Sequence, residues 1–228
     1  MKRLIAVVLA GLCLAGCTVT NTKLGLNLAS PPAGARVLLV KPDVQLAVLT
    51  AGGVDEARAD WSQQGQSNLE QSVATQLKSK SYAFKEVDPN TIMSGRSGQL
   101  IRLHQAVGES ILTFGYGLYA LPTKKAGLDW TLGDGAKALA DSQGADYALF
   151  VHASGNYASG GRVATAVGMA VIGVHIPLGS QTVFASLVDL RTGQVVWFNT
   201  ALAGPSDDMR TPAGAATLTT SLLTKIPL

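Results

Sequence analysis

The sequence predicts a single α/β domain, a sandwich in which helices pack against a mixed sheet that is antiparallel in its C-terminal half. Short apolar runs of strand length alternate with longer stretches whose apolar residues recur every three or four positions. Near the C-terminus, two strand-like runs are separated by a short turn, which is typical of an antiparallel hairpin. About 195 residues follow the N-terminal segments, enough for one domain with its own core.

The first half of the domain predicts two strands, a long helix and a third strand. Arg36–Val40 is a continuous apolar run stopped by Pro42, which favours a buried strand. Val44–Leu49 ends before a pair of glycines, where the chain turns. Asp55–Lys80 reads as a helix, and Tyr82–Val87 as a short strand. The apolar stripe of this helix has a spacing of four: Trp61, Gly65, Leu69, Val73 and Leu77. We interpret Trp61 as a core anchor rather than a platform for a ligand.

The second half begins with two helices. One runs from about Ser97, with apolar residues at spacings of three and four: Leu100, Leu103, Val107 and Ile111. The other, Asp134–Gln143, is rich in alanine and is followed by Gly144 at the usual position after a helix end. No internal repeat is visible.

Three strands and a last helix complete the predicted order of β, β, α, β, α, α, β, β, β, α. Asp146–Val151 predicts a central strand. Thr182–Leu190 and Gln194–Thr200 predict a hairpin with Gly193 in its turn. A threonine and a proline at positions 211 and 212 supply an N-cap and a first helical residue. The inner face of this helix is expected to carry Ala215, Leu218, Leu222 and Ile226.

One segment, Arg162–Gly179, fits neither pattern. It contains no charged residue after Arg162, and it has three glycines and one proline. Three interpretations remain open for it: buried core, a surface for self-association or a protein partner, and a membrane contact.

The N-terminus predicts a signal peptide over residues 1–16. Two basic residues precede the apolar stretch Leu4–Leu14. As a helix this stretch is about 16 Å long, about half of a hydrocarbon core of ~30 Å, so it is too short to span a membrane. Residues 17–35 are expected to form a lipidated cysteine and a tether, and residues 36–228 the α/β domain.

The junction Leu14-Ala15-Gly16-Cys17 resembles the bacterial lipobox. This resemblance implies cleavage before Cys17, a diacylglycerol on its thiol and further acylation, such as palmitate. Thr18 stands where an inner-membrane lipoprotein would usually carry Asp. The resemblance therefore implies that the protein is anchored in the periplasmic leaflet of the outer membrane.

The composition of the mature chain argues against a disulfide and against nucleic-acid binding. The sequence contains two cysteines, one in the signal peptide and one at the lipidation site, so the domain is expected to be stable without a disulfide. Removing two of the 18 basic residues with the signal leaves 16 against 15 acidic residues, a net charge of +1. A concentrated basic surface for nucleic acid is therefore not expected.

The sequence indicates no catalytic, cofactor-binding or metal site. His104, His152 and His175 are scattered without the spacing of metal ligands, and we interpret them as core or edge histidines. Asp55, Glu56 and Asp60 together suit the positive end of a helix. Ser159-Gly160-Gly161-Arg162 is read as a glycine loop entering the insertion, with an anion-binding nest as the alternative. Two glycine patterns, starting at 115 and 133, resemble a dinucleotide fingerprint, but no convincing strand precedes either.

Two runs of the sequence resemble the core of a group of periplasmic lipoproteins: Gly144–Val151 and, after an insertion, Val183–Trp197. The second run carries the hairpin pattern Asp-x-x-Thr-Gly-x-x-x-Trp. This group includes the curli production assembly/transport component family, a related family of uncharacterised lipoproteins, and the lipoproteins that activate penicillin-binding proteins. The match covers about residues 135–200. It implies a similar α/β fold, but the insertion lacks the alternation of the curli component's membrane-spanning hairpins.

We therefore expect a lipid-anchored, non-enzymatic protein of the cell envelope that acts by protein–protein binding. An oligomeric accessory of a secretion or assembly system is one form of this hypothesis. The expected partners are the membrane, through the lipid on Cys17, and other proteins or further copies of the chain. The alternatives are an activator of a peptidoglycan synthase, which needs a long tether, and an unrecognised periplasmic enzyme.

Overall fold

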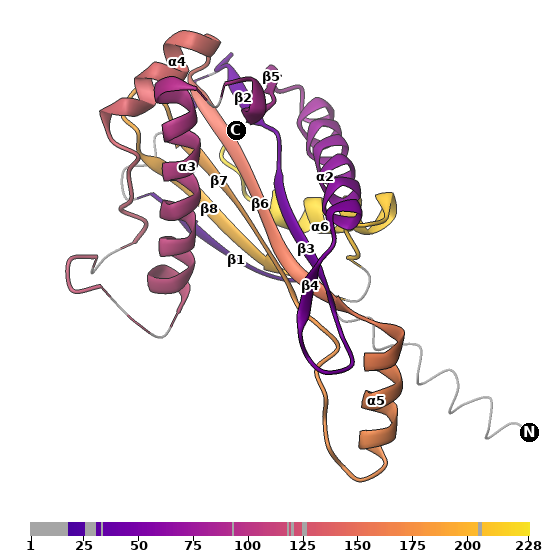
Figure 1. Cartoon of the computed structure of the whole chain (residues 1–228). Coiled ribbons are helices and arrows are strands. Elements are labelled where there is room, and N and C mark those ends of the chain that lie inside the picture. The colour runs from indigo at the N-terminus through magenta and orange to yellow at the C-terminus, as the bar shows by residue number, and fades with distance from the viewer. Residues whose placement is uncertain are drawn as a thin grey trace, which may run out of the picture.

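The computed structural model describes residues 18–25, 31–32, 34–92, 94–117, 119, 121–124, 127–204 and 207–228. Its centre is one eight-stranded mixed sheet with helices packed against it (Figure 1), which confirms the predicted fold class. The predicted signal peptide and Cys17 lie outside the described residues.

The strands form a continuous sheet in the order β1-β8-β7-β6-β2-β5, with β3 and β4 added beside β6. Strand β6 is parallel to β2, and β2 to β5, whereas β6, β7, β8 and β1 are antiparallel. The C-terminal half of the sheet is therefore antiparallel, as predicted. The strands are β1 Val19–Leu24, β2 Val37–Val40, β3 Asp43–Leu49, β4 Asp55–Ala57, β5 Phe84–Val87, β6 Tyr147–Ala158, β7 Gln181–Asp189 and β8 Val195–Leu202.

Helices cover both faces of the sheet (Figure 1). Helices α2 and α6 pack on one face, and α3 and α4 lie on the other, while α5 extends away from the sheet. The α-helices are α2 Ala59–Ser79, α3 Gly95–Ser110, α4 Lys137–Gln143, α5 Gly160–Ala170 and α6 Pro212–Leu222. Short 3-10 or π turns lie at Pro89–Thr91, Ile111–Tyr116 and Asp134–Ala136.

The central strands are apolar on both faces because each face has its own core. In β6, Tyr147, Leu149 and Val151 join the core under α2 and α6, whereas Ala148 and Phe150 join the core under α3 and α4. Strands buried on both faces read as continuous apolar runs, as expected here.

Strands β2 and β3 are two parts of one extended stretch interrupted at Pro42. Pro42 has no N–H to donate to a neighbouring strand, so the ladder breaks there. Both parts pair in parallel with β6: β2 pairs with the beginning of β6, and β3 pairs with its end. Strand β6 is long enough to pair with both because it continues to Ala158, seven residues beyond the predicted end at Val151.

Two predicted boundaries differ from the structure near the N-terminus. Val19–Leu24, inside the expected tether, forms β1 and pairs with β8 along its whole length. Asp55–Ala57 forms β4, a hairpin partner of β3, so α2 begins only at Ala59. In both cases polar residues form short strands through backbone pairing, which leaves little signal in hydropathy.

The inner face of α3 is rotated from the predicted one. Leu100 and Ile111 are buried as expected, but Leu103 is exposed and His104 is buried in its place. The buried positions Leu100, His104, Gly108 and Ile111 keep helical spacing. Counting His104 as apolar would have given the correct face.

Candidate functional site: an uncharged arm at one edge of the sheet

The segment between β6 and β7, residues 160–180, extends away from the sheet and is called the arm here (Figure 1). Helix α5 leads outward, and an extended segment returns to β7. No residue of α5 is buried. The segment Arg162–Gly179 is therefore not core, and that interpretation was wrong.

Local capping explains why the outward half of the arm is helical. Ser159 is the N-cap, and its hydroxyl accepts a hydrogen bond of 3.1 Å from the backbone N–H of Arg162. The proposed anion nest at this glycine pair is thus a capped helix start. At the other end Gly173, with φ of 78°, donates to the carbonyl of Ala170 and closes the last turn.

The arm has one half-buried side and a larger apolar surface in contact with water. Ala166 and Met169 of α5 and Ile176 of the returning segment are half-buried. Val171 and Ile172, at the tip, have exposed fractions of 84% and 70%. The exposed large apolar residues of the arm are Val163, Val167, Val171, Ile172, Val174 and Leu178.

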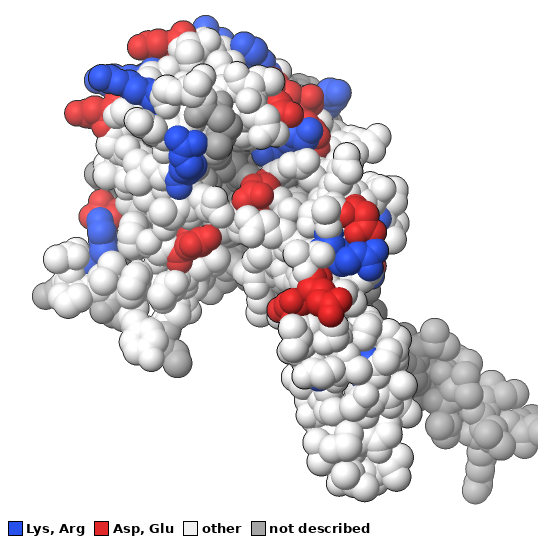
Figure 2. Space-filling view, in the orientation of Figure 1, with Lys and Arg blue, Asp and Glu red and all other residues white. Residues whose placement is uncertain are grey.

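The arm carries almost no charge. Between Arg162 and Asp189 the sequence has no acidic residue, lysine or arginine. Arg162 itself lies at the root, where its guanidinium donates to the carbonyl of Pro177 at 3.1 Å. In Figure 2 the arm is nearly all white, with acidic residues gathered at its root and mixed charges on the body. An uncharged apolar surface of this kind is a candidate interaction site.

Hydrogen bonds around Asn156 fix the root of the arm to the sheet. Its amide donates to Asp55 at 2.8 Å and accepts from the N–H of Ser180 at 3.0 Å. Its backbone N–H donates to the Ser180 carbonyl at 2.9 Å, and its carbonyl accepts from Gln181 at 2.7 Å. The arm therefore leaves the sheet in a defined direction.

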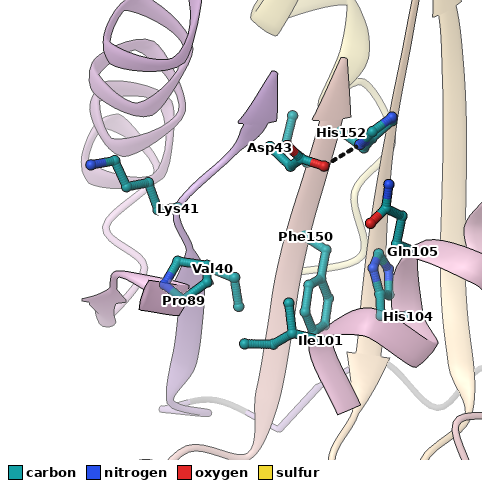
Figure 3. A pocket seen from close by; sticks show the side chains of 10 residues that line it. Val40, Lys41, Asp43, Pro89, Ile101, His104, Gln105, Phe150 and His152 are labelled. Atoms are coloured by element: carbon teal, nitrogen blue, oxygen red, sulfur yellow. Dashed lines mark hydrogen bonds and ion pairs between the residues drawn. The ribbon is translucent and has the colours of Figure 1, made fainter. Parts of the chain in front are cut away.

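Two of the three histidines lie beside a small cavity of about 50 Å³ between α3 and the sheet (Figure 3). His104 is stacked on Phe150 with ring centroids 3.7 Å apart, and its Nε2 lies 2.6 Å from the Ser186 hydroxyl. His152 is bonded to the Asp43 carboxylate at 3.0 Å. Sequence reasoning placed both histidines in the core or at its edge, and missed that the fold brings them to one cavity.

The ionisation of these groups favours a structural role. Burial, with a smaller contribution from His152, lowers the pKa of His104 to about 3, so its ring is neutral. The hydrogen bond from His152 lowers the pKa of Asp43. Ser186 is itself buried, and the cavity has room for about one or two waters. A serine and a histidine in contact here are not open to a substrate.

The remaining sites proposed from the sequence are dispersed. His175 is exposed on the arm. Among the described residues, no three histidine, cysteine or acidic side chains gather in a way that could hold a metal ion. None of the described helices is long and apolar enough to cross a membrane. Of the acidic trio expected at the helix start, only Asp60 lies in the first turn of α2.

Trp61 is a partly buried anchor between two guanidinium groups. Arg58 and Arg210 lie 4.4 and 4.5 Å from the centroid of its rings, and Arg210 also lies 3.6 Å from the ring of Tyr157. Asp208 binds Arg210 at 2.7 Å. Since Trp61 also packs against the core of α2 and α6, its role as an anchor is confirmed.

Comparison with known proteins gives only distant structural similarities. No family model and no curated protein matches the sequence. Solved structures with a related arrangement include the PelC dodecamer from Paraburkholderia phytofirmans, at 17% identity over 92% of this chain and 98% of that one, with a TM-score of 0.38. Lipoprotein GNA1162 from Neisseria meningitidis has 16% identity over 75% of this chain and 84% of that one, with a TM-score of 0.33. The LpoB C-terminal domain from Salmonella enterica has 15% identity over 75% of this chain and 82% of that one, with a TM-score of 0.27. At such scores and identities we infer no function from these similarities.

Proposed function

We propose that this chain is a lipid-anchored, non-enzymatic protein of the bacterial cell envelope that acts by binding, with the arm as its main contact surface. The anchor is the lipid on Cys17, and the place is the periplasmic leaflet of the outer membrane. The observation that carries this proposal is the arm itself, which exposes six large apolar side chains and fixes its root firmly to the sheet. Fixing such a surface in water costs stability unless something covers it.

The position of β1 argues against the alternative of a peptidoglycan synthase activator. Such a protein needs a long flexible tether between its lipid and its domain. Here the first residue of β1, Val19, follows Cys17 by two positions, and the hydroxyl of Thr18 donates to the Asp207 carboxylate. The lipid would therefore hold the body close to the membrane.

The anchor is tested by expressing the full chain and its Cys17→Ser variant in a Gram-negative host supplied with labelled palmitate. We expect label and outer-membrane fractionation for the full chain and neither for the variant. Label in both chains, or in neither, would contradict lipidation at Cys17.

The arm is tested in the same host with a photo-crosslinking amino acid at Ile172, compared with the same group at Ser142. Ser142 is exposed near the end of α4, at the opposite end of β6 from the arm. We expect adducts, to protein or to lipid, from position 172 and few from position 142. Equal yields at both positions would overturn the arm as the contact surface.

A further inference from the structure

We propose that the tip of the arm inserts into the same bilayer that holds the lipid on Cys17, so that the protein has two membrane contacts. This inference rests on the proposed function, because it takes the lipid on Cys17 as given. It goes further by naming what covers the arm.

The anchor and the arm share one edge of the sheet, where β1 begins and the arm rejoins β7. Val19 of β1 lies opposite Leu202 of β8, and Leu202 lies opposite Thr182 of β7, one residue after Gln181, where the arm rejoins the sheet. Strands are about 4.8 Å apart, so β1 and β7 are about 10 Å apart at this edge. Cys17 is joined to Thr18 by one peptide bond, which spans about 3.8 Å between α-carbons. A lipid on Cys17 therefore brings the root of the arm to the membrane surface.

Exposed apolar side chains also lie on the body at this edge, beside the acidic residues at the root of the arm. Val54 lies in the turn between β3 and β4, and the carbonyl of Leu49 at the end of β3 accepts from the N–H of Ser159 at the arm's root. Among the described residues outside the arm, the large apolar side chains exposed at this edge are Val19, Val54 and Leu202, with exposed fractions of 65%, 63% and 56%. The arm and these three side chains thus expose apolar surface at the same edge, where Asp55 and Glu56, beside Val54, are the exposed acidic residues of the root.

The length of α5 and the backbone of the tip suit partial insertion. The 11 residues of α5 span about 16 Å, which passes the headgroup layer but not a hydrocarbon core of ~30 Å. Backbone groups in lipid must be satisfied within the protein. At the tip, the N–H groups of Ile172 and Val174 both donate to the carbonyl of Met169, and Gly173 donates to Ala170.

The absence of charge favours a bilayer over attraction to an anionic surface. Helices that lie on membranes usually add lysine and arginine that attract anionic lipids. Apart from His175, the described arm has one basic residue, Arg162, and its guanidinium is held at the root. Insertion of the arm should therefore depend on apolar area, and in vesicles of phosphatidylcholine and phosphatidylethanolamine it should be insensitive to salt.

The test uses the lipidated chain reconstituted in phosphatidylcholine/phosphatidylethanolamine vesicles. An environment-sensitive fluorophore is placed on Ile172→Cys, with Ser142→Cys as the matched control. Cys17 is blocked by its lipid, and Cys13 leaves with the signal peptide. We expect a blue-shifted emission at 172 that acyl-chain-brominated lipids quench, unchanged by 0.5 M salt, and a water-like emission at 142. A water-like emission at 172 with no quenching by brominated lipid would overturn the inference.

A second variant keeps the inference falsifiable without relying on a label. Val171→Asp with Ile172→Asp changes two exposed residues, so folding is preserved, as circular dichroism checks. In the non-lipidated domain, residues 18–228, we expect vesicle binding to fall roughly 100-fold or more, because charged side chains are costly in hydrocarbon. Unchanged vesicle binding would also overturn the inference.

Failure of this inference can be told apart from failure of the proposed function. If the label at 172 stays in water but the photo-crosslinker there captures a second copy or another protein, the arm is a protein contact and the proposed function stands. If the crosslinker at 172 captures neither lipid nor protein, both are wrong.

Discussion

Helices α5 and α6 are each 11 residues long, each contain three alanines, and are capped by the hydroxyl of a serine or a threonine. Their surroundings are opposite. Helix α6 buries five residues against α2 and the sheet, whereas α5 buries none. The difference lies in position, because α5 begins beyond the end of β6, where no sheet remains to pack against. Apolar composition alone therefore does not say whether a helix stabilises the fold or serves as a contact.

The largest expected effect concerns the buried helix. Leu218→Ala in α6 removes a fully buried side chain and should lower the free energy of unfolding by about 2–5 kcal/mol. Val167→Ala in α5 removes an exposed side chain and should change it by less than about 0.5 kcal/mol. Urea denaturation of the non-lipidated domain measures both. Similar losses in the two variants would break the contrast between the helices.

The second prediction concerns pH and the body alone. His104 has a pKa of about 3 when folded and an ordinary value of 6.5, so the unfolded chain takes up a proton first as the pH falls. The free energy of unfolding should therefore decrease from pH 6.5 downward, by about 3 kcal/mol from this group at pH 4. His104→Gln should remove this part of the slope, measured by urea denaturation across pH 4–7. An unchanged slope would show that His104 is not desolvated in the fold.

The third prediction concerns the root that joins the two regions. Asn156→Ala removes the amide bonds to Asp55 and Ser180 and should cost about 1–2 kcal/mol of stability. Hydrogen exchange of the arm should become faster, while exchange in β6 near Leu149 should stay slow. If the arm of the variant exchanges as slowly as the arm of the parent, its direction is fixed by bonds other than those of the Asn156 side chain.

The smallest expected effect concerns the stack around Trp61. Arg210→Ala removes a guanidinium from two aromatic rings and should cost about 1 kcal/mol. Arg36→Ala is the control, because the Arg36 side chain forms an exposed ion pair with Asp146 and its loss should cost less than about 0.5 kcal/mol. Equal thermal shifts for the two variants would show that the stack adds nothing.

Most of the body could be predicted from the sequence because its signals are strong and local. The stripe of Leu69, Val73 and Leu77, the hairpin turn at Gly193 and the cap at Thr211 all have the predicted roles. In each case a periodicity or a turn residue sets the structure within a few positions.

The remaining features depend on contacts distant in sequence. Strand β1 is polar and exists because β8 pairs with it, about 180 residues away. His104 meets Ser186, and His152 meets Asp43, only once α3 and β3 are placed beside β6 and β7. The apolar character of Arg162–Gly179 was visible in the sequence, but its exposure depends on where β6 ends.

The most direct test of the central claim removes the arm. A variant in which Asn-Gly replaces residues 162–178, which keeps Ser180 and its bonds to Asn156, is compared with the parent domain, residues 18–228, by urea unfolding and by flotation with vesicles. We predict a free energy of unfolding within about 1 kcal/mol of the parent's, because no residue of α5 is buried, and loss of vesicle binding. An unfolded variant, or a folded one that binds vesicles as well as the parent, would contradict the account.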